Sequence, residues 1–301
     1  LPKMLKENGY TTASFHAYKK SFWNRYLMYP ALGIDTFYSL ESFEQDEPLG
    51  WSIADESMLT QSVQKMKHLE EPFYSFLITL TSHHPYDLPD EYKKLNVEGI
   101  YEMTFKNYLQ SVHYVDQAVG TFIEELKQAG LWENSVVIFY GDHDSGLLKE
   151  GSEMEAYLGV KDDPLAFNQM RGEVPLLIHL PEGEHAGIYD QIGGQIDLGP
   201  TILDLLGIPV NENYMMGTSL FDEEDRMVVF RTSSFYTEDV FYKASKEGGF
   251  EDGVCYDINT GDELPVQSCE EDYDRALKQL EVSDNVMKEN LIQEFVEQAE
   301  K

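Results

Sequence analysis

The sequence predicts an α/β fold with a doubly wound, mostly parallel sheet, followed by a small antiparallel sheet and a terminal helix. Over roughly the first 210 residues, apolar runs of strand length alternate with segments that repeat apolar side chains every three or four residues. Beyond about residue 223 the runs become short and alternating, which is typical of antiparallel strands. A charged helical pattern runs from about residue 270 to the end. We therefore expect two domains, residues 1–222 and 223–301.

The elements of the first domain follow from composition and spacing. Each predicted strand is an apolar run rich in β-branched and aromatic residues. The predicted strands are residues 10–16, 73–81, 135–140 and 174–180. Each predicted helix places its apolar side chains on one face, and Gly or Gly-x-Pro follows several of the ends. The predicted helices are residues 1–9, 53–70, 105–130 and 197–206.

The C-terminal domain is predicted from three alternating runs and a hairpin turn. The runs are residues 227–231, 241–244 and 254–258, and the turn is at 259–261. Cys255 and Cys269 flank this turn. A disulfide between them would suit a setting outside the cytoplasm, whereas two buried thiols are an equal alternative, because the strand register cannot be read from the sequence.

The charge balance is strongly acidic. The 301 residues include 55 acidic and 22 basic ones, which gives a net charge of −33. The 42% hydrophobic content is that of a folded protein. Such a surface repels nucleic acid and anionic lipid, so we expect no nucleic-acid partner. An anionic substrate would need a local basic spot that overcomes this field.

The ends of the chain indicate a piece of a longer protein. The first residue is Leu1, which enters a helical phrase at once, and no signal peptide is visible in these 301 residues. No run reaches the 18 or so apolar residues of a membrane helix. We expect an N-terminal truncation, so the compartment cannot be read from a targeting segment.

Asp142 and His143 follow the apolar run 135–140 directly. In open α/β sheets, ligands bind beyond the carboxyl ends of the strands. A carboxylate oxygen and an imidazole nitrogen together suit Zn²⁺ or Mn²⁺. The alternative for such a pair is a loop-capping Asp beside a surface His. The strand-end position favours a metal site.

Six phrases in sequence order resemble one family, and the likeness extends over nearly the whole chain, including residues 216–221 and the terminal hairpin and helix. The phrases are Ser-Phe-His at 14–16, Phe-Trp-Asn-Arg at 22–25, Ile-Thr-Leu-Thr-Ser-His at 78–83, Tyr-Gly-Asp-His at 140–143, Val-Pro-Leu-Leu-Ile-His at 174–179, and Asp-Leu-Gly-Pro-Thr-Ile-Leu-Asp-Leu-Leu-Gly at 197–207. The chain thereby resembles the extracellular catalytic domain of lipoteichoic acid synthases, in the sulfatase and alkaline phosphatase superfamily.

The resemblance implies an enzyme that transfers glycerol phosphate from phosphatidylglycerol to a polyglycerolphosphate chain, through a covalent intermediate on a threonine. It also implies membrane helices ahead of the catalytic domain, and a location on the outer face of the cell membrane of a Gram-positive bacterium. The nucleophilic Thr and an acidic metal ligand would lie upstream of Leu1. The chain alone would then be inactive.

Site roles carry over by position. Asp142 and His143 match ligands of Mn²⁺, with Mg²⁺ or Zn²⁺ as other candidates. Arg25 matches a ligand of the substrate phosphate, and Trp23 matches a residue that lines the glycerol pocket. His16 and His83 match two histidines that reach the phosphate and the leaving oxygen, and His83 is the candidate catalytic residue.

Each role has a plainer alternative. Arg25 could form a surface salt bridge, Trp23 could be a half-buried aromatic, and each His could cap a loop. Asp144, next to the pair, could support the metal site or form a turn.

The sequence departs from the family at Tyr18, where the synthases commonly carry an acidic residue or an amide. This leaves room for a primase with another acceptor. Two alternative functions stay open. One is a sulfatase or phosphodiesterase that passes the covalent intermediate to water. The other is a domain that binds glycerol phosphate without turnover.

Overall fold

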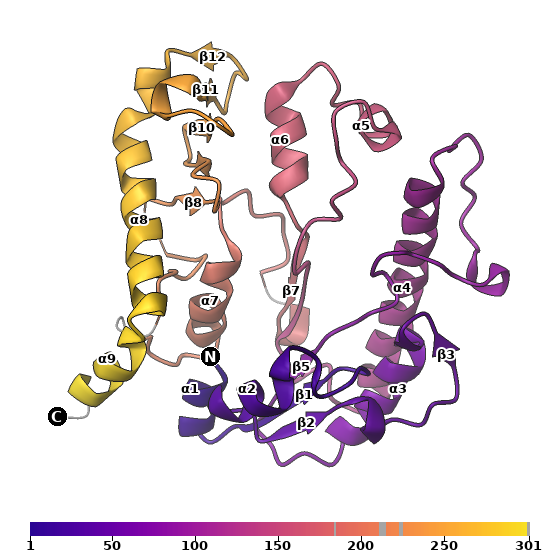
Figure 1. The fold of residues 1–301 in the computed structure, drawn as a ribbon. Helices are drawn as coiled ribbons and strands as arrows, with labels where there is room; N and C mark the ends of the chain where they lie inside the picture. The colour runs from indigo at the N-terminus through magenta and orange to yellow at the C-terminus, as the bar shows by residue number, and fades with distance from the viewer. Residues whose placement is uncertain (184, 211–214, 223–224, 300–301) are drawn as a thin grey trace. The chain divides into compact units, whose positions relative to one another are not determined.

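The computed structural model describes residues 1–183, 185–210, 215–222 and 225–299. The chain forms two compact units (Figure 1). The first comprises residues 1–159 and 174–186, and the second comprises residues 160–173 and 187–301. Among the described residues, no helix is long and apolar enough to cross a membrane. The predicted domain boundary at residues 222 and 223 stays a prediction.

The first unit is built on a three-stranded parallel sheet with the order β2-β1-β5. The strands are β2 (Thr36–Tyr38), β1 (Thr11–Phe15) and β5 (Phe73–Leu77). In the register, Ala13 of the central strand lies opposite both Thr36 and Ser75. From its second residue on, β1 is completely buried, as expected for an apolar strand covered on both faces. His16 follows β1 without a break.

Two long helices pack against each other and against this sheet (Figure 1). They are α3 (Asp55–Met66) and α4 (Met103–Gln128). Their apolar faces meet Phe15 of the sheet through Val63 and Phe122 in the main core. The smaller elements of the unit are α1 (Pro2–Glu7), η1 (Phe22–Asn24), α2 (Arg25–Ala31), η2 (Leu40–Ser42), β3 (Pro48–Leu49), β4 (Ser52–Ile53), η3 (Asp90–Tyr92), α5 (Glu153–Leu158) and η4 (Pro181–Gly183).

The strand that precedes Asp142 differs from the prediction. It is β6 (Val137–Tyr140), and it pairs antiparallel with β7 (Leu176–His179) in a separate two-stranded sheet. These strands are only partly buried, and Leu177 is 60% exposed. The expectation of buried strands in one mostly parallel sheet is therefore wrong for β6 and β7 in the structure, because an apolar run does not encode its strand partner or direction.

The second unit contains a five-stranded sheet, order β12-β11-β10-β9-β8, whose described pairs are antiparallel. The strands are β8 (Val228–Val229), β9 (Phe235–Tyr236), β10 (Val240–Lys243), β11 (Val254–Asp257) and β12 (Glu263–Leu264). The helices are α6 (Pro164–Gly172), η5 (Gln195–Asp197), α7 (Leu198–Leu205), η6 (Phe250–Asp252), η7 (Val266–Cys269), α8 (Glu270–Lys288) and α9 (Leu291–Ala299). The antiparallel sheet and helical C-terminus agree with the prediction.

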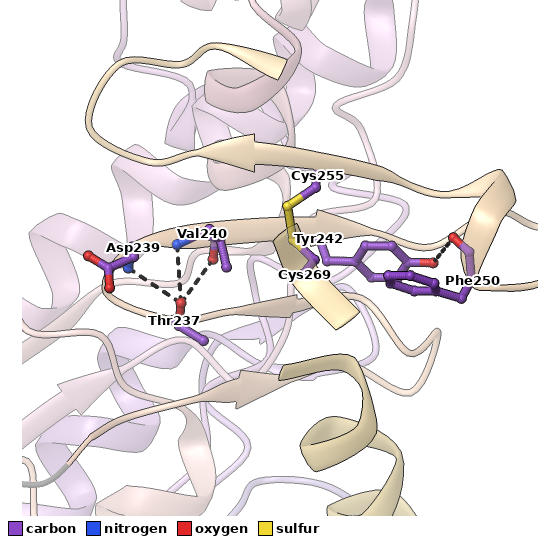
Figure 2. The surroundings of a disulfide bond; sticks show 7 residues. All are labelled: Thr237, Asp239, Val240, Tyr242, Phe250, Cys255 and Cys269. Carbon is purple, nitrogen blue, oxygen red and sulfur yellow. Dashed lines mark hydrogen bonds between the residues drawn. A yellow bond between two sulfur atoms is a disulfide. The ribbon is translucent and has the colours of Figure 1, made fainter. Parts of the chain in front are cut away.

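A disulfide joins Cys255 of β11 to Cys269, the residue before α8 (Figure 2). Both cysteines are completely buried in a core with Tyr242, whose hydroxyl donates to the carbonyl of Phe250 at 3.0 Å. At the turn before β10, the Thr237 hydroxyl accepts backbone N–H bonds (Figure 2). Of the two open alternatives for the cysteines, the structure contains the disulfide, and it ties the sheet to the long helix.

Candidate functional site

The six residues predicted for the site lie in the first unit, on segments that follow β1, β5 and β6. His16 comes directly after β1, and His83 lies in a turn after β5. Trp23 lies in η1, and Arg25 is the first residue of α2. The remaining two residues, Asp142 and His143, follow β6. His16, His83 and the Asp142-His143 pair therefore lie on loops that follow strands, whereas Trp23 and Arg25 lie on short helices.

His16 is held as a neutral imidazole. Its ring is 3% exposed, and Nδ1 lies 3.0 Å from the carbonyl oxygen of Ile78. Burial lowers the pKa of His16 to about 4; the Ile78 hydrogen bond acts against this, and nearby Arg25 adds to it. Because a carbonyl only accepts, Nδ1 must carry the proton of the neutral ring. Nε2 is then a hydrogen-bond acceptor near neutral pH.

Arg25 is a buried cation with an unsatisfied donor. The residue is 7% exposed, and its Nη1 atom is buried without a hydrogen-bond partner. The guanidinium carbon lies 5.3 Å from the ring centre of Trp23 and 5.8 Å from that of Phe22, within cation–π range. In the described part of the chain no carboxylate forms an ion pair with Arg25. Among the described residues Arg25 therefore forms no surface salt bridge, and its Nη1 could donate to an oxygen ligand.

Trp23 is 73% exposed, so it is not the half-buried aromatic of the alternative interpretation. Its φ angle is 52°, and that of Asn24 is 53°. Two successive non-glycine residues in the left-handed region are uncommon, and such backbone is found often at functional sites. This turn presents the indole ring over the Arg25 guanidinium.

A chain of rings connects the two histidines. The ring centre of Tyr18 lies 6.2 Å from that of His16, 5.1 Å from Phe22 and 6.3 Å from Trp51. The Trp51 ring in turn lies 4.8 Å from His83. The four predicted substrate residues thus belong to one aromatic cluster. Tyr18, which the sequence marks only as a departure from the family, lies at its centre.

Asp142 and His143 form an exposed donor pair. His143 Nε2 lies 3.8 Å from Asp142 Oδ1, and His143 Nδ1 lies 2.6 Å from the carbonyl oxygen of Asp144. That carbonyl fixes the proton on Nδ1 in the neutral ring and leaves the Nε2 lone pair toward Asp142. Two bonds of about 2.1 Å at a tetrahedral angle place their donors about 3.4 Å apart, so a small approach of the two side chains would let both atoms share one ion. The pair fits a divalent metal.

The pair alone does not complete a metal site. Within the described ranges, no group of three or more His, Cys, Asp or Glu residues could hold an ion. The Asp144 carboxylate accepts the backbone N–H of Gly146 at 2.9 Å, which is the geometry of a turn former. The loop after β5, which carries His83, is joined to the loop after β6, because the Tyr86 hydroxyl donates to the Ser145 carbonyl at 3.3 Å.

Gly141 permits the close approach that positions the pair. A Cβ at this position would lie 2.8 Å from Cβ of Val174. The backbone N–H of Gly141 donates to the Pro175 carbonyl at 3.0 Å. The turn into Asp142 is therefore tied to the segment before β7.

Asp55 is a residue of the site region that the sequence does not reveal. It is 1% exposed, and its two oxygens accept the backbone N–H groups of Leu80 and Thr81, both at 2.8 Å. The Asp55 N–H donates to the Thr81 hydroxyl at 3.1 Å. These bonds hold the start of the turn that leads to His83. In the sequence, Asp55 is an ordinary acid in a first helical turn, so no signal distinguishes it.

Asp55 should give the chain a measurable pH dependence. Burial raises the pKa of its carboxyl from 3.8 to about 6, against the opposing effect of its hydrogen bonds from Thr81 and Leu80. The folded chain therefore holds a proton that the unfolded chain lacks between these pH values. This contribution to stability is complete below about pH 4 and is lost as the pH rises through about 6, for a total of about 3 kcal/mol.

The measurement compares the wild type with Asp55→Asn, which cannot titrate. We expect the free energy of unfolding of the wild type to gain about 2 kcal/mol on the variant between pH 7 and pH 4, in denaturant titrations. His16 has a lowered pKa and opposes this trend, but it is present in both chains and cancels from the difference. A difference that does not depend on pH would contradict the raised pKa of Asp55.

Comparison with known proteins decides the family. A profile described as sulfatase matches residues 1–208 of the 301. The chain belongs to the sulfatase family. Lipoteichoic acid synthase 1 of Bacillus subtilis (strain 168) is 34% identical over 299 residues, which cover 97% of this chain and 45% of the relative. Lipoteichoic acid synthase of Staphylococcus aureus (strain USA300) is 32% identical over 297 residues, with 97% and 44% covered.

Solved structures agree with this assignment. The crystal structure of a lipoteichoic acid synthase from Listeria monocytogenes matches with a TM-score of 0.86 and 29% identity, over 95% of this chain and 72% of the other. A protein of the alkaline phosphatase superfamily from Vibrio parahaemolyticus matches with a TM-score of 0.74 and 22% identity, over 96% and 68%. The sulfatase-family chain thus has the alkaline phosphatase-like α/β fold, and it is a homologue of lipoteichoic acid synthases. It spans about half the length of the curated relatives.

Proposed function

We propose that this chain is the catalytic part of a metal-dependent phosphoglycerol transferase. It takes glycerol phosphate from phosphatidylglycerol and adds it to a polyglycerolphosphate chain on the outer face of the cell membrane. The observation that carries the proposal is the buried Arg25 guanidinium with an unsatisfied Nη1, in one aromatic cluster with both histidines. Homology to lipoteichoic acid synthases supports the substrate class. The buried disulfide agrees with a site outside the cytoplasm.

Substrate binding is the role of Arg25 and Trp23. In a chain with net charge −33, an anionic headgroup needs a local cation, and Arg25 supplies it. Its planar fork suits two phosphoryl oxygens, and desolvation strengthens such a charge-assisted bond. The exposed Trp23 ring lies over the guanidinium and offers an apolar face to the glycerol carbons.

Proton transfer is the role of the histidines. His83 Nδ1 lies 2.8 Å from the carbonyl oxygen of His84, so its Nε2 is left to exchange a proton with the leaving glycerol oxygen. The Trp51 ring packs beside His83, with the ring centres 4.8 Å apart. His16, neutral and with Nε2 as an acceptor, can hydrogen-bond a hydroxyl of the substrate or acceptor. It does not serve as the acid near neutral pH.

Asp142 and His143 would hold Mn²⁺, or Mg²⁺ or Zn²⁺ in its place. When bound, the ion supplies Lewis-acid stabilisation of phosphoryl oxygens and acidifies a nucleophilic hydroxyl. We propose that a threonine nucleophile and a further acidic ligand come from the part of the longer protein that these 301 residues do not span.

The test is a transfer assay with the full-length protein. Vesicles that contain phosphatidylglycerol with a labelled glycerol headgroup should yield labelled polymer in the presence of Mn²⁺. We expect a chelator to abolish transfer, and Mn²⁺ to restore it. Label released only as free glycerol phosphate would favour a hydrolase of the same superfamily.

Mn²⁺ titration gives a second readout that does not depend on turnover. The 301-residue chain should bind Mn²⁺ weakly because the pair offers only two donors, whereas the full-length protein should bind it firmly. Binding of headgroup without metal or turnover in the full-length protein would favour a non-catalytic binding domain.

A further inference from the structure

We propose that η1, α2 and the residue after them form a surface that docks on an anionic lipid bilayer. This membrane-docking surface comprises Phe22, Trp23, Tyr26, Leu27, Met28 and Leu32. It deepens the proposed function and rests on it for the lipid class, because it would bring the Arg25 and Trp23 site to the plane of the phospholipid headgroups.

The helix α2 is anomalous for a surface helix. Only Arg25 and Tyr29, one turn apart, are buried. A surface helix normally turns charged and polar side chains to the solvent. Here Tyr26 is 48% exposed, Leu27 is 60% exposed and Met28 is 40% exposed. An unpartnered apolar face of this kind marks an interaction site.

The apolar face continues on both sides of the helix. Phe22 is 40% exposed and Trp23 is 73% exposed in η1, and Leu32, just beyond α2, is 49% exposed. Trp and Tyr rings favour the boundary between headgroups and acyl chains, where one end of the ring is apolar and the other wet. Short amphipathic segments bind that boundary by burying such side chains.

The charge of this segment is opposite to that of the chain. Residues 8–34 contain no Asp or Glu, although the whole chain carries 55 in 301 residues, so about five would be expected. The segment contains Lys19, Lys20 and Arg25. This local reversal favours an anionic bilayer over an acidic protein surface such as a second copy of this chain.

The acidic neighbours of the segment are few and placed at its border. Asp35 follows the segment and is paired with Lys6 of α1. Glu41 lies within electrostatic range of Lys20. Glu7 and Lys3 line a groove with Pro30 and Gly33 at the far end of α2. Lys19 and Lys20 are both exposed beside the apolar face, and of the two, Lys20 has Glu41 as an acidic neighbour.

The experiment measures flotation of the 301-residue chain with vesicles of phosphatidylglycerol and phosphatidylcholine, 3:7, against phosphatidylcholine alone. The test variant is Leu27→Glu with Met28→Glu. The matched control is Val282→Glu with Met287→Glu on α8, which adds the same charge at positions 45% and 75% exposed. Circular dichroism checks that the wild type and both variants are folded. If the double variant is unfolded, the single change Leu27→Gln replaces it as the test variant.

We expect the bound fraction on phosphatidylglycerol vesicles to fall about tenfold or more in the test variant and to stay unchanged in the control. Replacing Lys19 and Lys20 by Gln should weaken binding to phosphatidylglycerol vesicles several-fold. Equal binding of the wild type and the test variant would overturn the inference. So would sedimentation of the wild type as a dimer that the test variant loses, because the surface would then be covered by a second copy.

Activity of the full-length protein separates this inference from the proposed function. The Leu27→Glu, Met28→Glu variant should lose transfer from vesicles but keep it from monomeric short-chain phosphatidylglycerol. Absence of turnover on both substrates in the wild type would reject the proposed function and leave the flotation result to decide the docking surface. Equal loss on both substrates in the variant would overturn the docking role.

Discussion

Replacement of His143 by alanine is expected to reduce transfer by the full-length protein at least about a hundredfold and to leave its fold intact. The reason for the loss is that His143 provides one of the two donors of the pair, 3.8 Å from the other. The reason for the intact fold is that the side chain is 68% exposed and its described contacts are with its two sequence neighbours, Asp142 and Asp144. Initial rates at saturating Mn²⁺ and thermal melts measure the two effects.

His68→Ala is the matched control, because this histidine is also exposed and has no assigned role. Its rate should equal that of the wild type. Wild-type transfer by the His143→Ala variant would remove His143 from the mechanism. Loss of transfer with a collapse of the melting temperature would instead make it a structural residue.

The long elements of the fold were predictable because their patterns are local. The apolar stripe of α4 repeats over seven turns, and the apolar run of β1 is bounded by Gly9 and His16. Both elements are found within about two residues of their predicted bounds. The partner of β6 was not predictable, since strand direction depends on contacts with residues almost 40 positions away.

The helix α2 was missed for a related reason. Its apolar residues lie on the exposed side as well as the buried side, so the segment has no amphipathic period. Pro30 within the helix adds to the difficulty, because proline ordinarily argues against a helix interior. The exposed apolar side chains of α2 thus obscure the helical pattern in the sequence, and the same side chains support the proposed docking surface.

The positions of candidate site residues were predictable where a histidine or a carboxylate directly follows an apolar run. His16 and the Asp142-His143 pair stand directly after apolar runs, and the structure places them at the ends of strands. Asp55 was not predictable, because its burial and its two bonds to the loop before His83 exist only after folding. The roles of the six site residues stay predictions until the variants are measured.

Replacement of Arg25 by alanine should reduce kcat/KM for phosphatidylglycerol by about 30- to 1,000-fold, which corresponds to about 2–4 kcal/mol of transition-state stabilisation. Its buried Nη1 has no hydrogen-bond partner among the described residues, and under the proposed function it would bind a phosphoryl oxygen. Its removal should therefore cost little stability, since the loss of contact with the Trp23 ring is offset by the relief of a buried unsatisfied donor.

Two further variants distinguish the phosphate role from a general charge effect. Arg25→Lys keeps the charge but cannot form the two-pronged contact, so its kcat/KM should lie between those of the wild type and Arg25→Ala. Arg231→Ala removes an exposed arginine that pairs with Asp284 at 2.8 Å, and it should leave kcat/KM unchanged. If Arg25→Lys were as active as the wild type, a point charge would suffice, and the orientation of the buried fork would have no part in holding the phosphate.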